Sequence, residues 1–154
     1  MTLFDAHNHL QDERFGGHQA VLLDTAKRNG VHRMVVNGAC EEDWSAVLEL
    51  AQKDETVIPS VGFHPWYLHE CKTGWQQRLE ILLREHPAKV GEIGLDRWIL
   101  GQTRSFLRHF SPAFSAHGPA TIDIQITAFV DQLELAQVRQ LQETFRCKST
   151  SYVA

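Results

Sequence analysis

The sequence predicts an α/β fold, and two observations lead to this class. Short apolar runs alternate with amphipathic segments along the first hundred residues, which is the pattern of a parallel sheet with helical crossovers. The runs Arg33-Met34-Val35-Val36 and Val57-Ile58-Pro59-Ser60-Val61 are apolar instead of alternating, as in strands buried on both faces. About four strand–helix units fit the chain, whereas a complete (β/α) barrel of the TIM type takes about 250 residues. We therefore expect an incomplete barrel.

The expected elements follow one another from the first residues. Four strands are expected, at residues 3–8, 31–36, 57–63 and 89–95. Three amphipathic helices are expected between them, near 18–29, from 41–43 onward and around 75–83. Gly30 suits the end of the first helix, the acidic cluster 41–43 favours the start of the second, and Pro87 stops the third.

The pattern changes after residue 96. Residues 97–122 contain no acidic residue but several arginines and aromatic residues, so we expect either an irregular insertion that covers the sheet or a loop that holds a nucleic-acid backbone and stacks bases. A last helix is expected near 124–145, with its apolar face made of Ile126, Phe129, Val130, Leu133, Leu141 and Phe145. The polar segment 146–154 is expected to be a disordered tail.

Composition limits the class of protein. We expect one domain over residues 1–154, because 43% of the residues are hydrophobic and the chain can bury one core. A net charge of −4 lacks the basic character of a dedicated nucleic-acid binder, although a bound metal can supply positive charge locally. Cys40, Cys71 and Cys147 show no paired spacing, and no segment resembles a signal peptide or a membrane span. We expect a soluble cytoplasmic protein without a membrane partner.

The string Phe4-Asp5-Ala6-His7-Asn8-His9-Leu10 holds the strongest chemical signal. Strand side chains alternate between faces, so Asp5, His7 and His9 point the same way. Two imidazoles at this spacing reach one divalent cation, and a nearby carboxylate joins them or orients a ring nitrogen. This string predicts half of a metal site, with Asp5 as a supporting carboxylate.

Two more motifs lie at the ends of later strands. Gly62-Phe63-His64-Pro65-Trp66 places His64 where a barrel binds substrate, and the alternative is a structural hydrogen-bonding role. Val90-Gly91-Glu92-Ile93-Gly94-Leu95-Asp96 has Glu92, Gly94 and Asp96 on one face if it is a strand. An acidic residue in a parallel strand is costly unless it is paired or bound to a cation. Glu92 is therefore a candidate bridging ligand, and Asp96 a candidate supporting residue.

Together the three motifs resemble the TatD family of metal-dependent hydrolases, over roughly residues 1–100 and with a weaker similarity in 128–136. The resemblance implies a (β/α) barrel, one or two divalent ions and phosphodiester cleavage, usually described as deoxyribonuclease activity. It implies that His7 and His9 are metal ligands, Glu92 a catalytic bridging ligand and His64 a contact to the phosphate of DNA or another phosphodiester. Imidazole and carboxylate ligands suit Zn, Mn and Fe, and Mg favours more oxygens.

The later ligands and the aspartate base of that family have no counterpart in this sequence. A truncated gene, a frameshift or an alternative transcript would each produce such a chain. One alternative is therefore a catalytically impaired fragment that binds metal or acts as an interaction module, with self-association through an open sheet edge. Another alternative is an amide or lactone hydrolase with the same centre.

Overall fold

The protein is described by a computed structural model that covers residues 1–102 and 119–150, with side chains as far as residue 140. The four strands are β1 (Leu3–Asn8), β2 (Val31–Gly38), β3 (Val57–Val61) and β4 (Lys89–Val90). The four α-helices are α1 (Gln19–Arg28), α2 (Trp44–Lys53), α3 (Trp75–Glu85) and α6 (Ile122–Thr150). Short 3-10 helices span Glu13–Phe15, Pro65–Glu70 and Ile99–Gly101. No helix in these described ranges is long and apolar enough to cross a membrane.

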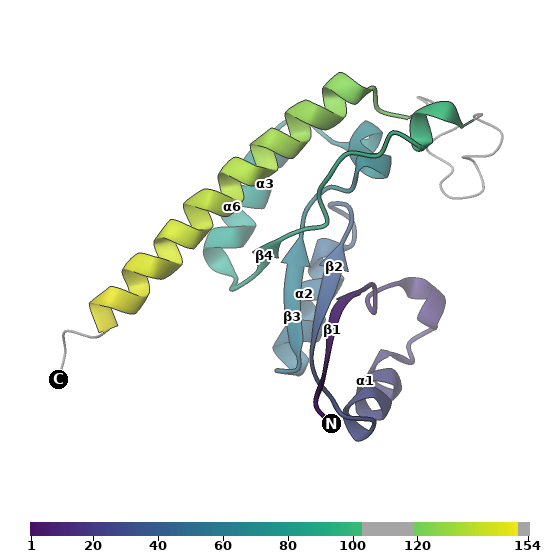
Figure 1. Cartoon of the computed structure of the whole chain (residues 1–154), viewed down its shortest axis with the longest axis vertical. Helices are drawn as coiled ribbons and strands as arrows, with labels where there is room; N and C mark the ends of the chain where they lie inside the picture. The colour runs from purple at the N-terminus through teal and green to yellow at the C-terminus, as the bar shows by residue number, and fades with distance from the viewer. Residues whose placement is uncertain (103–118, 151–154) are drawn as a thin grey trace.

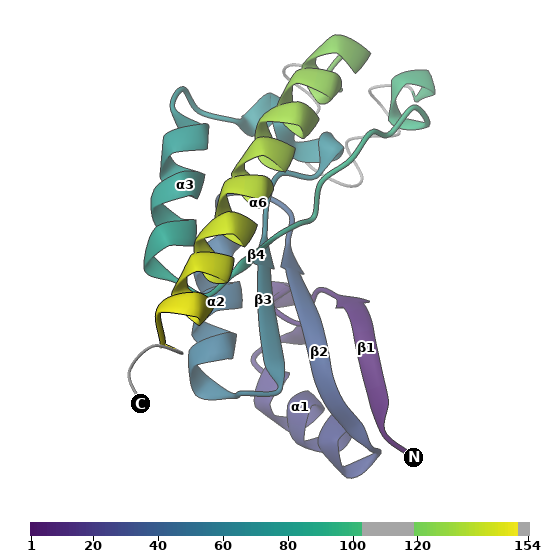
Figure 2. The same cartoon turned by 60° about the vertical axis from the view of Figure 1, so that its left-hand side comes forward.

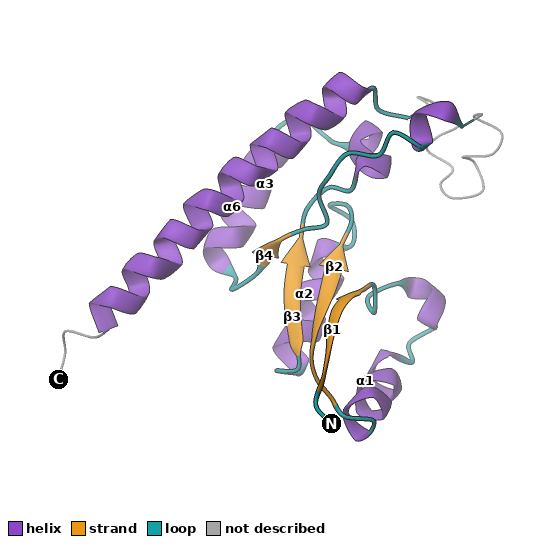
Figure 3. Ribbon diagram, in the orientation of Figure 1, coloured by secondary structure: helices purple, strands orange, loops and turns teal. Residues whose placement is uncertain are grey.

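The strands form one parallel sheet in the order β1-β2-β3-β4, drawn in orange in Figure 3. In the register of the sheet, Met34 of β2 pairs with Asp5 of β1 on one side and with Val57 of β3 on the other. Helix α2 packs on β2 and β3, while α6 packs on β4 and lies beside α3 (Figures 1 and 2). The expected α/β class, with parallel strands and helical crossovers, is confirmed.

The core lies between the sheet and the apolar faces of α2 and α3. Its centre is Phe63, whose ring makes edge contacts with Trp44 of α2 and Trp75 of α3 at centroid distances of 5.1 and 5.2 Å. The indole nitrogen of Trp44 donates to the carbonyl of Gly62 at 2.9 Å. These contacts hold the segment after β3, which carries His64.

The fourth strand is shorter than the sequence predicted. Pairing stops at Val90, and the segment 91–95 is not a strand, so the expected alternation of Glu92, Gly94 and Asp96 on one face is wrong. At the end of β4, Gly91 passes so close to Ser60 that a Cβ atom at this position would lie 2.6 Å from Ser60 Oγ. The peptide bond between Gly91 and Glu92 is cis.

Helix α6 buries a different face from the one that the sequence predicted. Its inward side consists of Gln125, Ala128, Gln132, Leu135 and Arg139. The expected apolar residues Ile126, Val130 and Leu133 are exposed. The glutamines face inward because they bind backbone groups that the sheet leaves unpaired.

The expected boundaries of the last third also differ in the structure. Helix α6 begins at Ile122 and reaches Thr150, which lies inside the segment 146–154 expected to be disordered. The expected insertion 97–122 contains the 3-10 helix Ile99–Gly101. Its residues 103–118, with Arg104 and Arg108, lie outside the described residues, as do residues 151–154.

Candidate metal centre

Three predicted ligands meet at the carboxyl ends of the strands. His7 Nε2 lies 3.4 Å from Glu92 Oε1, and His9 Nε2 lies 3.4 Å from Glu92 Oε2. One ligand atom from each residue can be chosen so that all three atoms lie within 4.8 Å of one another. The two imidazoles meet edge to face, at 82° between their planes.

The sheet brings these residues together although they lie at or just beyond the ends of its two outer strands. His7 belongs to β1, and Glu92 follows β4 on the far side of β2 and β3. The backbone N–H of Glu92 donates to the carbonyl of Gly38, at the end of β2. This bond directs the segment after β4 back across the ends of the strands. Glu92 therefore faces β1.

Asn37, at the end of β2, contacts both histidines. Its backbone carbonyl lies 2.7 Å from His9 Nδ1, and its side-chain Nδ2 lies 3.3 Å from His7 Nδ1. A carbonyl oxygen can only accept, so His9 Nδ1 carries the proton of the neutral ring and Nε2 keeps its lone pair. His9 is thus in the tautomer that a metal ligand needs, and the donor set fits a divalent cation.

A second layer of polar residues supports Asn37. Gln11 Nε2 donates to the Asn37 carbonyl at 2.7 Å and to Asp43 Oδ2 at 3.1 Å. Asp43 also accepts from the backbone N–H of Ala39 at 3.0 Å. Burial raises the pKa of Asp43, and these hydrogen bonds act against that rise. The network fixes the end of β2 beside the imidazoles.

The other predicted site residues lie around this cluster. Asp5 Oδ1 accepts from the backbone N–H of His7 at 3.1 Å, and Asp5 Oδ2 accepts from Asn8 Nδ2 at 2.9 Å. Asp5 therefore shapes the end of β1. His64 precedes the 3-10 helix Pro65–Glu70, and its Nδ1 accepts from the backbone N–H of Trp66 at 3.2 Å. Burial lowers the pKa of His64, which favours the neutral ring.

Asp96 contacts two tryptophans. Its Oδ2 accepts from Trp66 Nε1 at 2.5 Å, and its Oδ1 accepts from the backbone N–H of Trp98 at 2.8 Å. Asp96 is not a member of the cluster that His7, His9 and Glu92 form. Asp96 therefore contacts the aromatic residues beside the cluster, and its supporting role toward the metal stays a prediction.

A cleft of about 710 Å³ opens beside the cluster. His9, Glu92, His64 and Trp66 contribute to its lining, so the candidate ligands and the predicted substrate contact share one space. Asn37 and Gln11 were not predicted as site residues. The available signal was the polar residue Asn37 at the carboxyl end of an apolar strand, next to the strand that carries the histidines.

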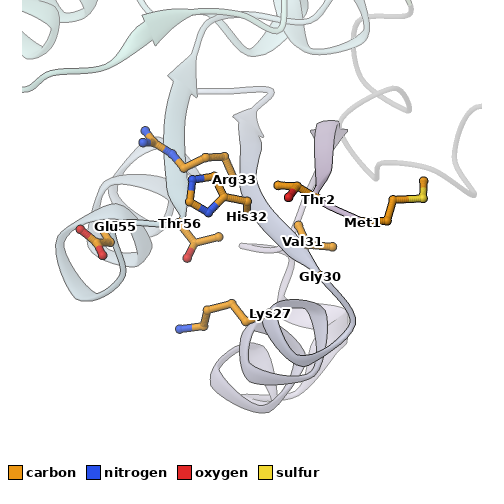
Figure 4. A pocket seen from close by; sticks show the side chains of 9 residues that line it. All are labelled: Met1, Thr2, Lys27, Gly30, Val31, His32, Arg33, Glu55 and Thr56. Carbon is orange, nitrogen blue, oxygen red and sulfur yellow. The ribbon is translucent and has the colours of Figure 1, made fainter.

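Another pocket lies at the opposite end of the sheet (Figure 4). It measures about 510 Å³, and its basic side chains are Lys27, His32 and Arg33. Lys27 is bound to Asp54 at 2.5 Å. Parallel α/β barrels place their sites at the carboxyl ends of the strands, and this pocket lies at the amino ends. We assign the site to the cleft beside Glu92.

The fold and the cluster define a parallel α/β protein with a His–His–Glu centre at the carboxyl ends of its strands. The chain belongs to the family described as TatD related DNase, whose model matches residues 4–142. This match confirms the family that the three motifs indicated.

Named relatives support the same assignment. The chain is 27% identical over 133 residues to the "uncharacterized metal-dependent hydrolase YjjV" of Escherichia coli K12, covering 77% of this chain and 51% of that protein. It is 28% identical over 97 residues to the "uncharacterized metal-dependent hydrolase YabD" of Bacillus subtilis 168, covering 61% of this chain and 37% of that protein. The crystal structure of YjjV, a TatD homolog, matches with a TM-score of 0.70 and 26% identity, over 90% of this chain and 48% of that one. The chain spans about half the length of YjjV and less of YabD.

Proposed function

We propose that this chain provides the first metal ligands of a metal-dependent hydrolase that cleaves phosphodiester bonds, with DNA or another phosphodiester as substrate. The observation that supports this proposal best is the convergence of His7, His9 and Glu92, with ligand atoms within 4.8 Å of one another. The family description and the names of the relatives point to the same chemistry. The free thiols of Cys40 and Cys71 are compatible with action in the reducing cytoplasm.

Each residue has a distinct task in this proposal. His7 and His9 bind the cation through Nε2, and Glu92 binds it through its carboxylate. When bound, a divalent cation supplies a Lewis acid that activates water and offsets phosphate charge. His64 contacts the substrate phosphate from the same cleft as a neutral ring. The mixed imidazole and carboxylate set favours Zn or Mn over Mg.

The test is hydrolysis of bis(p-nitrophenyl) phosphate by the purified chain with Zn²⁺, Mn²⁺ or Mg²⁺. We expect metal-dependent hydrolysis that the His7→Ala/His9→Ala double variant lacks. The matched control is His18→Ala/His32→Ala, because both of these histidines are exposed and lie outside the cluster. Metal binding is measured in parallel by titration calorimetry.

The outcomes distinguish the proposed enzyme from a metal-binding module without catalytic activity. Metal binding that requires His7 and His9, without hydrolysis, would support a metal-binding module and contradict the enzymatic proposal. Equal hydrolysis by the double variant and by the wild type would show that the cluster is not the active centre.

A further inference from the structure

Three consecutive backbone carbonyls at the end of β2 each accept a hydrogen bond from one residue of the candidate site. In chain order, the acceptors are the carbonyls of Asn37, Gly38 and Ala39. Their donors are, in the same order, His9 Nδ1–H at 2.7 Å, the backbone N–H of Glu92 at 3.3 Å and the backbone N–H of His64 at 2.9 Å. We call residues 37–39 the carbonyl triplet. Two candidate ligands and the predicted substrate contact are therefore held by one short segment.

The side chain of Asp43 holds the carbonyl triplet in place. Its Oδ2 accepts from the backbone N–H of Ala39 at 3.0 Å, and its Oδ1 accepts from the backbone N–H of Cys40 at 3.3 Å. The carboxylate also lies against Gly38, where a Cβ atom would be 2.8 Å from Asp43 Oδ1. A side chain at residue 38 would displace the carboxylate, so glycine at this position allows the close approach.

Gln11 connects Asp43 to the first carbonyl of the triplet. An amide nitrogen carries two hydrogens, and Gln11 Nε2 donates to Asp43 Oδ2 at 3.1 Å and to the Asn37 carbonyl at 2.7 Å. The two acceptors fix the orientation of this buried amide. The Asn37 carbonyl thus uses both of its lone pairs, one for Gln11 and one for His9.

Asp43 does not make the local contact that its position in the chain offers. It is the N-cap residue of α2, where an aspartate usually accepts from a backbone N–H in the first turn of its own helix. The Asp43 side chain makes no such bond. Its oxygens bind Gln11 and the turn after β2 instead. Capping of α2 therefore does not explain the contacts of Asp43.

We infer that Asp43 is a positioning residue for the candidate metal centre, and that it acts through Gln11 and the carbonyl triplet on His9 and Glu92. The inference rests on the metal-binding part of the proposed function and not on the bond that is cleaved. Without the carboxylate, Gln11 no longer holds the Asn37 carbonyl, and the proton of His9 is no longer confined to Nδ1. A His9 ring with its proton on Nε2 cannot bind a cation through that nitrogen.

The test compares Asp43→Asn with the wild type by two measurements. Nitrogen-15 NMR of the metal-free protein reports the tautomer of His9, and titration calorimetry reports the affinity for Zn²⁺. Asparagine keeps the size of the side chain but replaces one acceptor oxygen with an N–H donor. We expect a mixed tautomer of His9 and a Zn²⁺ affinity about tenfold lower, at the lower end of the effect of residues that support metal ligands.

A second variant and a control accompany Asp43→Asn. Gln11→Met should act in the same direction, because it removes the bond to the Asn37 carbonyl and leaves Asp43 in place. Asp131→Asn is the matched control. Asp131 also accepts from a glutamine amide, Gln76 Nε2 at 3.0 Å, but it lies on α6 and does not line the cleft. This variant should leave both the tautomer and the affinity unchanged.

The two measurements separate the inference from fold stability and from the proposed function. If Asp43→Asn only lowers the urea midpoint, and the folded variant keeps the tautomer and the Zn²⁺ affinity of the wild type, the inference is overturned. If the wild type binds no Zn²⁺, the proposed function fails, and the tautomer in the metal-free protein still decides the role of Asp43. If Asp43→Asn does not fold, Gln11→Met decides in its place. An effect of Asp43→Asn alone would overturn the connection through Gln11.

Discussion

At the scale of single residues, Asn37 organises the candidate centre without being a ligand. Its carbonyl fixes the tautomer of His9, and its side chain contacts His7. Residues that orient metal ligands in this way typically change metal affinity by about 10–100-fold when they are replaced. A substitution of Asn37 therefore tests the candidate metal centre while all three candidate ligands stay in place.

We expect Asn37→Leu to weaken Zn²⁺ binding about tenfold, at the lower end of that range. The effect is partial because the leucine backbone still presents a carbonyl to His9. Titration calorimetry measures the affinity, and nitrogen-15 NMR of the imidazoles reports the tautomers. The control is Asn29→Leu, because Asn29 is exposed at the end of α1. Unchanged affinity in Asn37→Leu would show that its side chain does not orient His7.

The thiol of Cys40 gives a prediction about pH. Burial raises the pKa of Cys40 to about 12, and the carboxylates of Asp43 and Glu42 add to the rise. Burial likewise raises the pKa of Cys71 to about 12. A raised thiol pKa lowers the fraction of reactive thiolate at pH 8, and this fraction grows about tenfold per pH unit until the pKa is reached.

In a Cys147→Ser background, we expect iodoacetamide to label the native protein at pH 8 at least about 100-fold more slowly than the urea-unfolded protein. The labelling rate of the native protein should rise steadily between pH 8 and pH 11. Mass spectrometry measures both rates. Rapid labelling at pH 8 would mean that these thiols are accessible and ionised, against the half-buried positions of both cysteines and their raised pKa.

At the scale of secondary-structure elements, α6 binds the rest of the protein through buried amides. Gln132 Oε1 accepts from the backbone N–H of Phe63 at 2.6 Å, and Gln132 Nε2 donates to the Phe63 carbonyl at 3.3 Å. Gln125 makes the equivalent pair of bonds to the backbone of Asp96. Each glutamine acts like a neighbouring strand for one residue beyond the sheet. Both bound segments carry predicted site residues.

We expect Gln132→Leu to lower the free energy of unfolding by about 1–3 kcal/mol, because the buried N–H and carbonyl of Phe63 lose their partner. Urea denaturation measures the change. Gln137→Leu is the matched control, since Gln137 is exposed on the same helix. Equal stability of the two variants would show that water or a backbone shift replaces the bonds of Gln132.

The sequence predicted some parts of this arrangement for the right reason and others for the wrong one. The parallel strands with helical crossovers and the pairing of His7 with His9 follow from apolar runs and spacing. Glu92 was selected by an alternation that does not exist, because the chain leaves the sheet after Val90. Its position beside the histidines depends instead on the course of the segment after β4.

Contacts between residues that lie far apart in the sequence could not be predicted. The bond from His9 to the Asn37 carbonyl depends on the register between β1 and β2, and no side-chain pattern records which carbonyl an imidazole reaches. Helix α6 was expected to bury Ile126, Val130 and Leu133. The unpaired backbone at Phe63 and Asp96 outweighs that apolar pattern, since a buried polar group without a partner is costly.

At the scale of the whole molecule, two apolar surfaces lie open in the described part of the chain. Strand β1 pairs only with β2 among the described strands, and its Phe4 is 58% exposed. Helix α6 exposes Ile126, Val130 and Leu133 on one face. An unpaired edge strand with apolar side chains favours association with another chain. We propose that this chain self-associates through the β1 edge.

The expected result is a mass in solution that rises with protein concentration, measured by sedimentation velocity. Phe4→Lys should shift the equilibrium toward the monomer, because a charge on an edge strand opposes pairing. Val21→Lys is the control, since Val21 is similarly exposed on α1. A monomer at all concentrations would contradict the proposal.

The buried amide of Gln132 has a consequence for hydrogen exchange. The N–H of Phe63 lies beyond the last paired residue of β3, where protection from deuterium is normally lost. Because this N–H donates to a buried side chain of α6, it exchanges only when α6 separates from the sheet. Its exchange rate, followed by NMR, therefore reports how often the last helix detaches from the segment that carries His64.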